Sequence, residues 1–248
     1  MILSKTHGFV FIKGVKVGGT SIEIALSAFC GPDDIITPIT PIDELKRLDA
    51  NGGARNYLGD RAGELAYLDT LRRTAVSDLA NLSPPTSPYF NHMSLRDVLR
   101  LQGTPALDYQ VVCVERNPYA KILSWVNHQL SFGAYQVGGE MRSDWRTLKG
   151  YLDQAIENRS IAAVKNIERY RAFNGSISAH VMRFERLDHD FKAFLGTLGI
   201  DFPQTLPHAK KGILANDLDP RGLLNRQQVM QINEIFREEF EAFNYKQI

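Results

Sequence analysis

A short apolar stretch, a glycine-rich loop and an apolar-periodic segment follow one another near the start of the chain, at residues 9–23. The apolar stretch Phe9–Ile12 is short enough for a buried strand. The segment that starts at Thr20 carries apolar residues at helical spacing. A strand, a glycine-rich loop and a helix in this order direct backbone N–H groups and the positive end of a helix at an anion. The stretch therefore predicts an α/β fold with an anion site at the start of its first helix.

The loop has the glycine spacing of a nucleoside triphosphate P-loop but not its lysine. Gly14 and Gly19 are correctly spaced, and Ser21 stands where that motif has serine or threonine. The residue after the second glycine is Thr20, whereas the loop's lysine, Lys16, stands three residues before that glycine. This arrangement keeps the phosphate-binding backbone and moves the cation. It argues against Mg-ATP hydrolysis and favours another phosphorylated ligand.

A second strand, loop and helix follow at residues 108–130. The run 108–115 predicts a buried strand, Arg116 follows it directly, and Ser124 lies two turns into the next helix. Parallel pairing with the first strand brings Arg116 to the same rim of the sheet as the glycine loop, where open α/β sheets bind ligands. A guanidinium there suits bidentate contact with a second phosphate, and Ser124 can add a hydroxyl.

The rest of the chain predicts one domain, 1–248, with a three-layer fold around a mostly parallel sheet. Prolines and glycines between about 32 and 90 mark a helical and loop insertion over one end of the sheet. Ser94, with Asp97 three residues later, predicts a helix that starts with a capping box. Residues 131–150 predict a mobile loop. The other expected elements are a strand at 178–184 and helices at 63–82, 191–198 and 227–243.

The composition excludes several classes of protein. The chain has 248 residues, of which 44% are hydrophobic, and its net charge of +1 predicts no general attraction to nucleic acid or to an anionic membrane. No apolar run approaches the ~18 residues of a membrane span. The first strand begins too close to Met1 for a signal peptide, so we expect a cytoplasmic protein. Cys30 and Cys113 are expected to be buried free thiols, and no spacing suggests a metal site.

Two segments carry a resemblance to a known family. Lys16-Val-Gly-Gly-Thr-Ser21 after an apolar strand resembles the 5′-phosphosulfate loop of sulfotransferases that use 3′-phosphoadenosine 5′-phosphosulfate (PAPS), and it is closest to that of the membrane-type carbohydrate sulfotransferases. Val15 and Val17 depart from the proline and threonine usual there. Residues 111–124, with Arg116 and Ser124, resemble the family's 3′-phosphate motif. Weaker similarity covers 181–199, 231–245 and the basic residues Lys210 and Lys211, which are similar to a loop of cytosolic sulfotransferases.

This resemblance implies a P-loop-type fold and transfer of a sulfuryl group from PAPS to a hydroxyl, most plausibly of a carbohydrate, with adenosine 3′,5′-bisphosphate as product. Lys16 would stabilise the charge that builds on the leaving phosphate. No metal is required, because the donor is already activated. The residues implied in binding the donor are Lys16, Gly18, Gly19, Thr20, Ser21, Arg116, Ser124 and Lys211.

The acceptor hydroxyl also needs a general base, and histidine titrates near the working pH. His92 is the first candidate, because it precedes a helix where related carbohydrate sulfotransferases carry a histidine segment. His128, His208 and the carboxylate Glu23 are the alternatives. Two other functions remain open for the chain as a whole: a P-loop-type small-molecule or nucleotide kinase, and a nucleotide-binding protein without catalysis.

Overall fold

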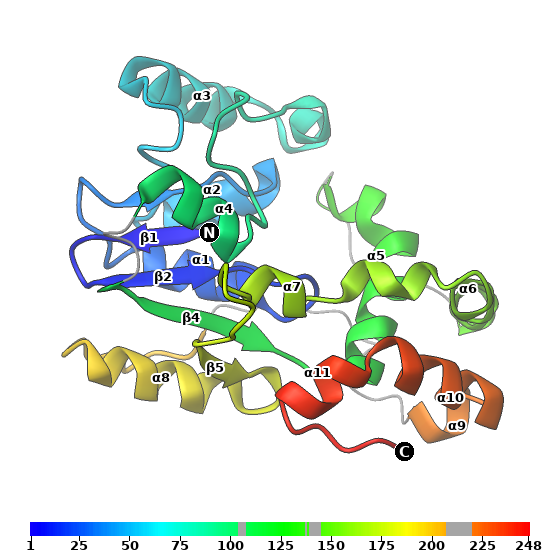
Figure 1. The fold of residues 1–248 in the computed structure, drawn as a ribbon. Coiled ribbons are helices and arrows are strands. Elements are labelled where there is room, and N and C mark those ends of the chain that lie inside the picture. The colour runs from blue at the N-terminus through cyan, green and yellow to red at the C-terminus, as the bar shows by residue number, and fades with distance from the viewer. Residues whose placement is uncertain (104–107, 137, 139–144, 207–219) are drawn as a thin grey trace.

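A five-stranded sheet flanked by helices forms the centre of the protein (Figure 1). The computed structural model describes residues 1–103, 108–136, 138, 145–206 and 220–248. The strand order is β3-β1-β2-β4-β5. The strands are β1 (Ile2–Ser4), β2 (Phe9–Ile12), β3 (Ile35–Ile36), β4 (Gln110–Glu115) and β5 (His180–Arg183).

The sheet is mixed, so the prediction of a mostly parallel sheet was only half right. Strands β2, β4 and β5 pair in parallel, as expected, but β1 pairs antiparallel with both β2 and β3. Only the four residues 5–8 separate β1 from β2. A connection this short permits a hairpin, whereas a parallel return needs a dozen or more residues. Gly8, with φ +65°, adopts the left-handed conformation that this turn requires.

The two faces of the sheet pack against different helices. On one face, Phe9 and Phe11 of β2 pack with α1 (Gly19–Ser27) and α8 (Leu187–Thr197). On the other, Val10 and Ile12 pack with α4 (Leu95–Gln102) and α7 (Ile167–Tyr170). This alternation follows from the two-residue repeat of a strand, and both sets are apolar because both faces are covered.

A second group of helices packs beside the sheet. It comprises α5 (Pro118–Gln136), α6 (Trp145–Glu157), η3 (Ser160–Val164), α9 (Pro220–Leu223), α10 (Arg226–Ile235) and α11 (Arg237–Ala242), which share one apolar cluster. The prediction of a mobile loop at 131–150 was wrong for its described part, because α5 continues to residue 136 and α6 begins at 145. The expected helix at 227–243 is divided into α10 and α11.

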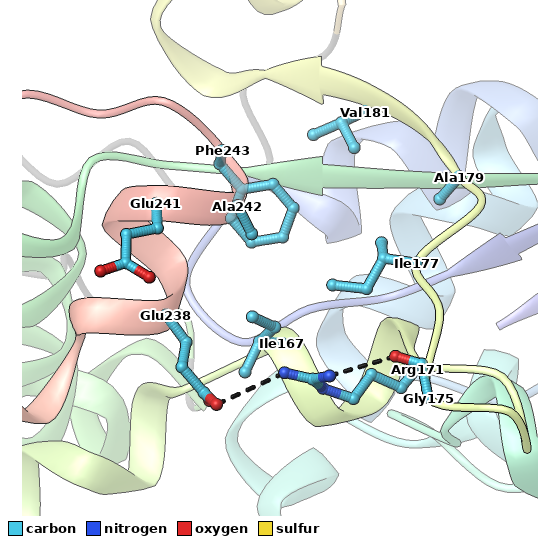
Figure 2. Close-up of a pocket in the computed structure, with 10 residues that line it drawn as sticks. All are labelled: Ile167, Arg171, Gly175, Ile177, Ala179, Val181, Glu238, Glu241, Ala242 and Phe243. Carbon is cyan, nitrogen blue, oxygen red and sulfur yellow. Dashed lines mark hydrogen bonds and ion pairs between the residues drawn. The ribbon is translucent and has the colours of Figure 1, made fainter.

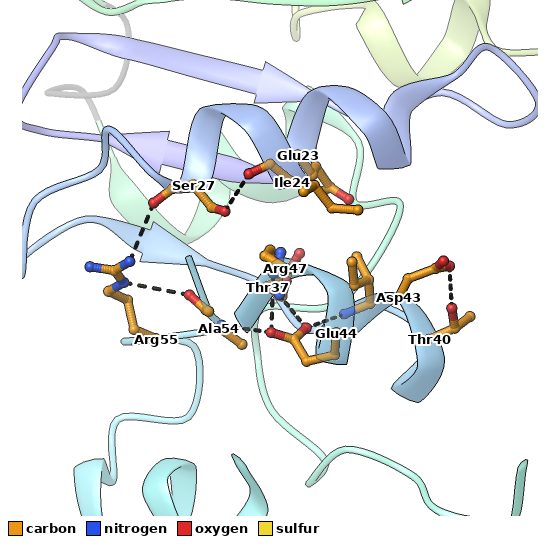
Figure 3. A network of polar contacts seen from close by, with 12 residues as sticks. Glu23, Ile24, Ser27, Thr37, Thr40, Asp43, Glu44, Arg47, Ala54 and Arg55 are labelled. Atoms are coloured by element: carbon orange, nitrogen blue, oxygen red, sulfur yellow. Dashed lines mark hydrogen bonds and ion pairs between the residues drawn. The ribbon is translucent and has the colours of Figure 1, made fainter. Parts of the chain in front are cut away.

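Residues 32–90, the predicted insertion, contain α2 (Pro41–Asp49), α3 (Arg61–Arg73) and the 3-10 helix η1 (Val76–Asn81), with a small apolar cluster of their own. The helix expected at 63–82 therefore ends at Arg73 and resumes as η1. A buried polar network fastens α2 to the segment after β3 (Figure 3). The carboxylate of Glu44 accepts bonds from the N–H groups of Ile39 and Ala54, and Arg47 bonds both to Glu44 and to the carbonyl of Thr37.

The local prediction at α4 is confirmed, and that at the cysteines is confirmed in part. Cys30 and Cys113 are both free thiols as expected, but only Cys113 is buried, whereas Cys30 is half-buried. Ser94 caps α4 and Asp97 returns the bond, so the capping box is complete. Among the described residues no helix is long and apolar enough to cross a membrane.

Replacing Ser94 by alanine should lower the free energy of unfolding by ~1 kcal/mol, because the N–H of Asp97 loses its acceptor at the start of α4. Urea denaturation measures the change. Ser178→Ala is the matched control, since Ser178 is exposed and lies outside any helix. Equal stability of the two variants would contradict a stabilising role for the cap.

Candidate functional site

The glycine loop presents a row of backbone N–H groups at the start of α1. Lys16 and Gly18 have left-handed backbone conformations, with φ +61° and +80°, and Gly18 occupies the N-cap position without a side-chain cap. In the part of the chain that the structure describes, no acceptor bonds the N–H groups of Val17, Gly18, Gly19 or Thr20. Consecutive N–H groups of this kind at a helix start form an anion-binding nest.

A residue far along the chain holds this loop in place. The side chain of Asn166, just before α7, accepts a bond from the N–H of Val15 (2.7 Å) and donates one to its carbonyl (3.1 Å). Gly14 must be glycine, because a Cβ there would lie 2.1 Å from the hydroxyl of Tyr170. Sequence reasoning missed both Asn166 and Tyr170. The approach of α7 to the loop carries no signal in the local sequence.

Arg116 lies at the end of β4, as predicted, and the structure brings it close to the loop. Its guanidinium carbon is 3.9 Å from the ring centroid of Phe184, in the 3-10 helix η4 (Phe184–Arg186). A Cβ at Gly18 would lie 3.0 Å from an edge carbon of the same ring. One aromatic ring thus contacts both predicted anion sites. Burial lowers the pKa of Arg116 to about 10, so the side chain keeps its charge at neutral pH.

An acidic residue that sequence reasoning did not anticipate lies near Arg116. One carboxylate oxygen of Glu185 accepts a bond from the N–H of Asn117 (2.8 Å), and the other accepts from the hydroxyl of Tyr245 (3.0 Å). The negative charge of Glu185 favours the protonated form of Arg116. A phosphate bound at Arg116 would therefore also face the negative charge of Glu185.

Glu23, one of the candidate bases, is engaged in buried ion pairs. Lys13 at the end of β2 lies 2.7 Å from one of its oxygens, and the Met1 ammonium bonds the other. Burial alone would raise the pKa of Glu23, but Lys13 and the Met1 ammonium outweigh it and hold the pKa well below its usual range. A fully buried carboxylate with such partners is a poor acceptor for a substrate proton.

His92, the preferred candidate, lies beside the end of β2. Its Nδ1 is 3.2 Å from the carbonyl oxygen of Lys13, so Nδ1 must carry the hydrogen and Nε2 is the basic nitrogen. Burial, followed by the positive charge of Lys13, lowers the pKa of His92 to about 3. The imidazole is therefore neutral across the physiological range. The residue adopts φ +62°, and its own carbonyl accepts a bond from Arg169 (2.6 Å).

The remaining predicted residues lie on α5 or outside the described part of the chain. Ser124 is half-buried on α5, and among the described residues it has no hydrogen bond to the loop or to Arg116. His128 lies one turn further along α5 and stacks on Phe132 with centroids 4.2 Å apart. Lys211 and His208 lie outside the described residues. The described residues contain no cluster of side chains able to hold a metal ion.

A groove of about 640 Å³ lies elsewhere, between α7, α11 and the segment that leads into β5 (Figure 2). Its floor is apolar, and Arg171, Glu238 and Glu241 line its polar side. None of the residues predicted for the anion sites lines it. The groove is a separate feature of the surface from the loop and Arg116. Its lining residues are Ile167, Arg171, Gly175, Ile177, Ala179, Val181, Glu238, Glu241, Ala242 and Phe243.

Comparisons with protein-family models, with curated proteins and with solved structures gave no match to this chain. The functional argument therefore rests on the residues of the site and on their geometry.

The low pKa of His92 predicts a loss of stability in acid. The unfolded chain binds a proton on this residue below pH 6.5, but the folded protein does so only near pH 3, so stability falls as the pH drops. As the pH falls from 8 to 5, protonation of His92 in the unfolded chain should lower the free energy of unfolding by about 2 kcal/mol. Urea denaturation of His92→Gln across this range should show a flatter dependence on pH. His189→Gln, at a side chain that is 78% exposed, is the control; an unchanged slope in His92→Gln would refute the assignment.

Proposed function

We propose that the protein is a PAPS-dependent sulfotransferase that moves a sulfuryl group to an acceptor hydroxyl, most plausibly of a carbohydrate. The observation that carries the proposal is the contact of Phe184 with both Gly18 and Arg116. Through this ring the nest of N–H groups and the guanidinium lie near each other, as binding of both phosphates of one bisphosphorylated adenosine would require. The resemblance of residues 9–23 and 111–124 to the family's two phosphate motifs supports the same ligand.

Each group then has a distinct task. The N–H groups of Val17 to Thr20 bind the 5′-phosphate, and Lys16 stabilises the charge that develops on it as the bond from sulfur to the bridging oxygen breaks. Arg116 binds the 3′-phosphate. Ser124 and Lys211 are further candidates for that end of the ligand. Adenosine 3′,5′-bisphosphate leaves as the sulfuryl group joins the acceptor oxygen.

His92 is the proposed general base. The Lys13 carbonyl holds its Nδ1–H, which leaves Nε2 to accept the proton of the acceptor hydroxyl. A pKa of about 3 makes a weak base. Bound phosphate and sulfate groups beside the loop would raise it, because their negative charge favours the imidazolium and opposes the effect of Lys13. His128 is the next candidate, since Glu23 is held in ion pairs.

Two rival functions make different predictions. A P-loop kinase would bind Mg-ATP in preference to adenosine 3′,5′-bisphosphate, although Thr20 stands in place of its lysine. A nucleotide-binding protein without catalysis would bind the bisphosphate and show no turnover. Calorimetry with adenosine 3′,5′-bisphosphate and with Mg-ATP separates the first rival from the proposal.

Arg116→Ala should weaken the binding of adenosine 3′,5′-bisphosphate by ~1.5–3 kcal/mol, because a charged hydrogen bond to the 3′-phosphate is lost. The binding of adenosine 5′-monophosphate should weaken much less. Calorimetry measures both, and Arg72→Ala, at an exposed arginine of α3, is the control. Equal losses for the two nucleotides would mean that Arg116 does not bind the 3′-phosphate.

Lys16→Ala should abolish sulfuryl transfer in an assay with radiolabelled PAPS and a panel of saccharides.

His92→Ala should lower kcat by ~10²–10⁴ without weakening the binding of adenosine 3′,5′-bisphosphate, as expected for a general base. Lys5→Ala, at an exposed lysine before the loop, should keep full activity. Undiminished turnover in Lys16→Ala would contradict the proposed role of the loop, and an unchanged rate in His92→Ala would shift the role of base to His128.

A further inference from the structure

A continuous line of buried polar bonds runs from Arg116 to the glycine loop. The N–H of Arg116 donates to a carboxylate oxygen of Glu115 (2.9 Å), and the same oxygen accepts from Lys121 (2.7 Å). Lys121 also bonds one oxygen of Glu239 on α11 (2.6 Å). The line therefore starts at the backbone of Arg116, whose guanidinium is the proposed ligand of the 3′-phosphate, and leads through α5 to α11.

The second half of the line returns to the loop. The other oxygen of Glu239 accepts bonds from the N–H groups of Asn166 and Ile167. Asn166 in turn holds both the N–H and the carbonyl of Val15 with its side chain. Val15 directly precedes Lys16, whose left-handed backbone opens the row of N–H groups at α1. Glu239, a residue of a different helix, is thus connected to the nest through Asn166 and Val15.

Burial makes the four linking side chains behave as one unit. Glu115, Lys121, Asn166 and Glu239 are all fully buried. Two carboxylates share one ammonium there, and a buried charge that loses its partner is costly, so the members cannot move independently. Burial, opposed by Lys121 and reinforced by Glu239, raises the pKa of Glu115 to about 7, as expected where negative charge exceeds positive charge.

We propose that this line of bonds couples the two anion sites, so that a phosphate bound at Arg116 and a phosphate bound at the loop strengthen one another, with Glu239 and Asn166 as positioning residues. The identity of the ligand rests on the proposed function. The hold of Glu239 on the loop does not, and it can be tested without any ligand.

The ligand-free test is amide hydrogen exchange of Val15, followed by NMR. In Glu239→Leu the acceptor of the Asn166 and Ile167 N–H groups is lost, and exchange at Val15 should accelerate by ~10-fold or more relative to the wild type. Glu238→Leu is the matched control, because Glu238 is the preceding residue and its side chain is 54% exposed; its Val15 exchange should not change. Unchanged exchange in a folded Glu239→Leu protein would overturn the proposal.

The coupling itself is measured by calorimetry with adenosine 3′,5′-bisphosphate on Arg116→Ala, Asn166→Ala and the double variant. Independent sites lose affinity multiplicatively, whereas coupled sites do not. The double variant should bind at least ~5-fold more tightly than the product of the two single losses predicts. If the loss of affinity in the double variant agrees within ~2-fold with the product of the two single losses, the proposal is overturned. Asn166→Ala removes no charge, so this measurement still tests the coupling if Glu239→Leu does not fold.

The two failures are distinguishable. If the wild-type protein does not bind the bisphosphate, the proposed function is wrong, and the exchange of Val15 alone decides whether Glu239 positions the loop. If the bisphosphate binds but the losses multiply and Val15 exchange is unchanged, the proposed function stands and the coupling is refuted.

Discussion

Parallel pairing of β2, β4 and β5 is the constraint on which the candidate site depends. The register sets Ile12 opposite Cys113 and Cys113 opposite Val181, so the three strands end at one edge of the sheet. Lys13 and the loop, Arg116, and Phe184 each follow one of these ends. A shift of one residue in either ladder would exchange the side chains that face the two layers of helices and would move the loop relative to Arg116. The geometry of the site is therefore as stable as the core beneath it.

The site also concentrates buried charge. Lys13 and Glu23, Arg116, and the group of Glu115, Lys121 and Glu239 all lie within or beside the ends of the strands. Such pairs add little net stability compared with apolar residues of similar volume, because desolvation offsets their attraction. Their value lies in specificity of position. They lie near the ends of β2 and β4, where the neutral imidazole of His92 bonds the Lys13 carbonyl and Arg116 follows β4.

The local elements were predictable where the signal was local. The strand before the loop, the helix at Gly19, and the capping box of Ser94 and Asp97 follow from residues within a few positions of one another. The antiparallel β1 was missed, because three residues offer too little periodicity. The last turns of α5 and the start of α6 were missed because glycine and polar residues suggested a loop, whereas packing against α10 and η3 stabilises α6. The anion sites were proposed from motifs, but Phe184 and Asn166 have no motif.

The sequence by itself determined the α/β character of the chain, the nest at the start of α1 and the presence of a cation after β4. These properties depend on residue type and short-range spacing. Only the tertiary structure decided that Phe184 lies between Gly18 and Arg116, that Glu23 is locked in ion pairs while His92 keeps a basic nitrogen, and that Glu239 holds the loop through Asn166. Apart from the ion pairs of Glu23, these contacts join residues about 70 to 170 positions apart. Their energies come from burial and exclusion of water, which no local pattern of residues encodes.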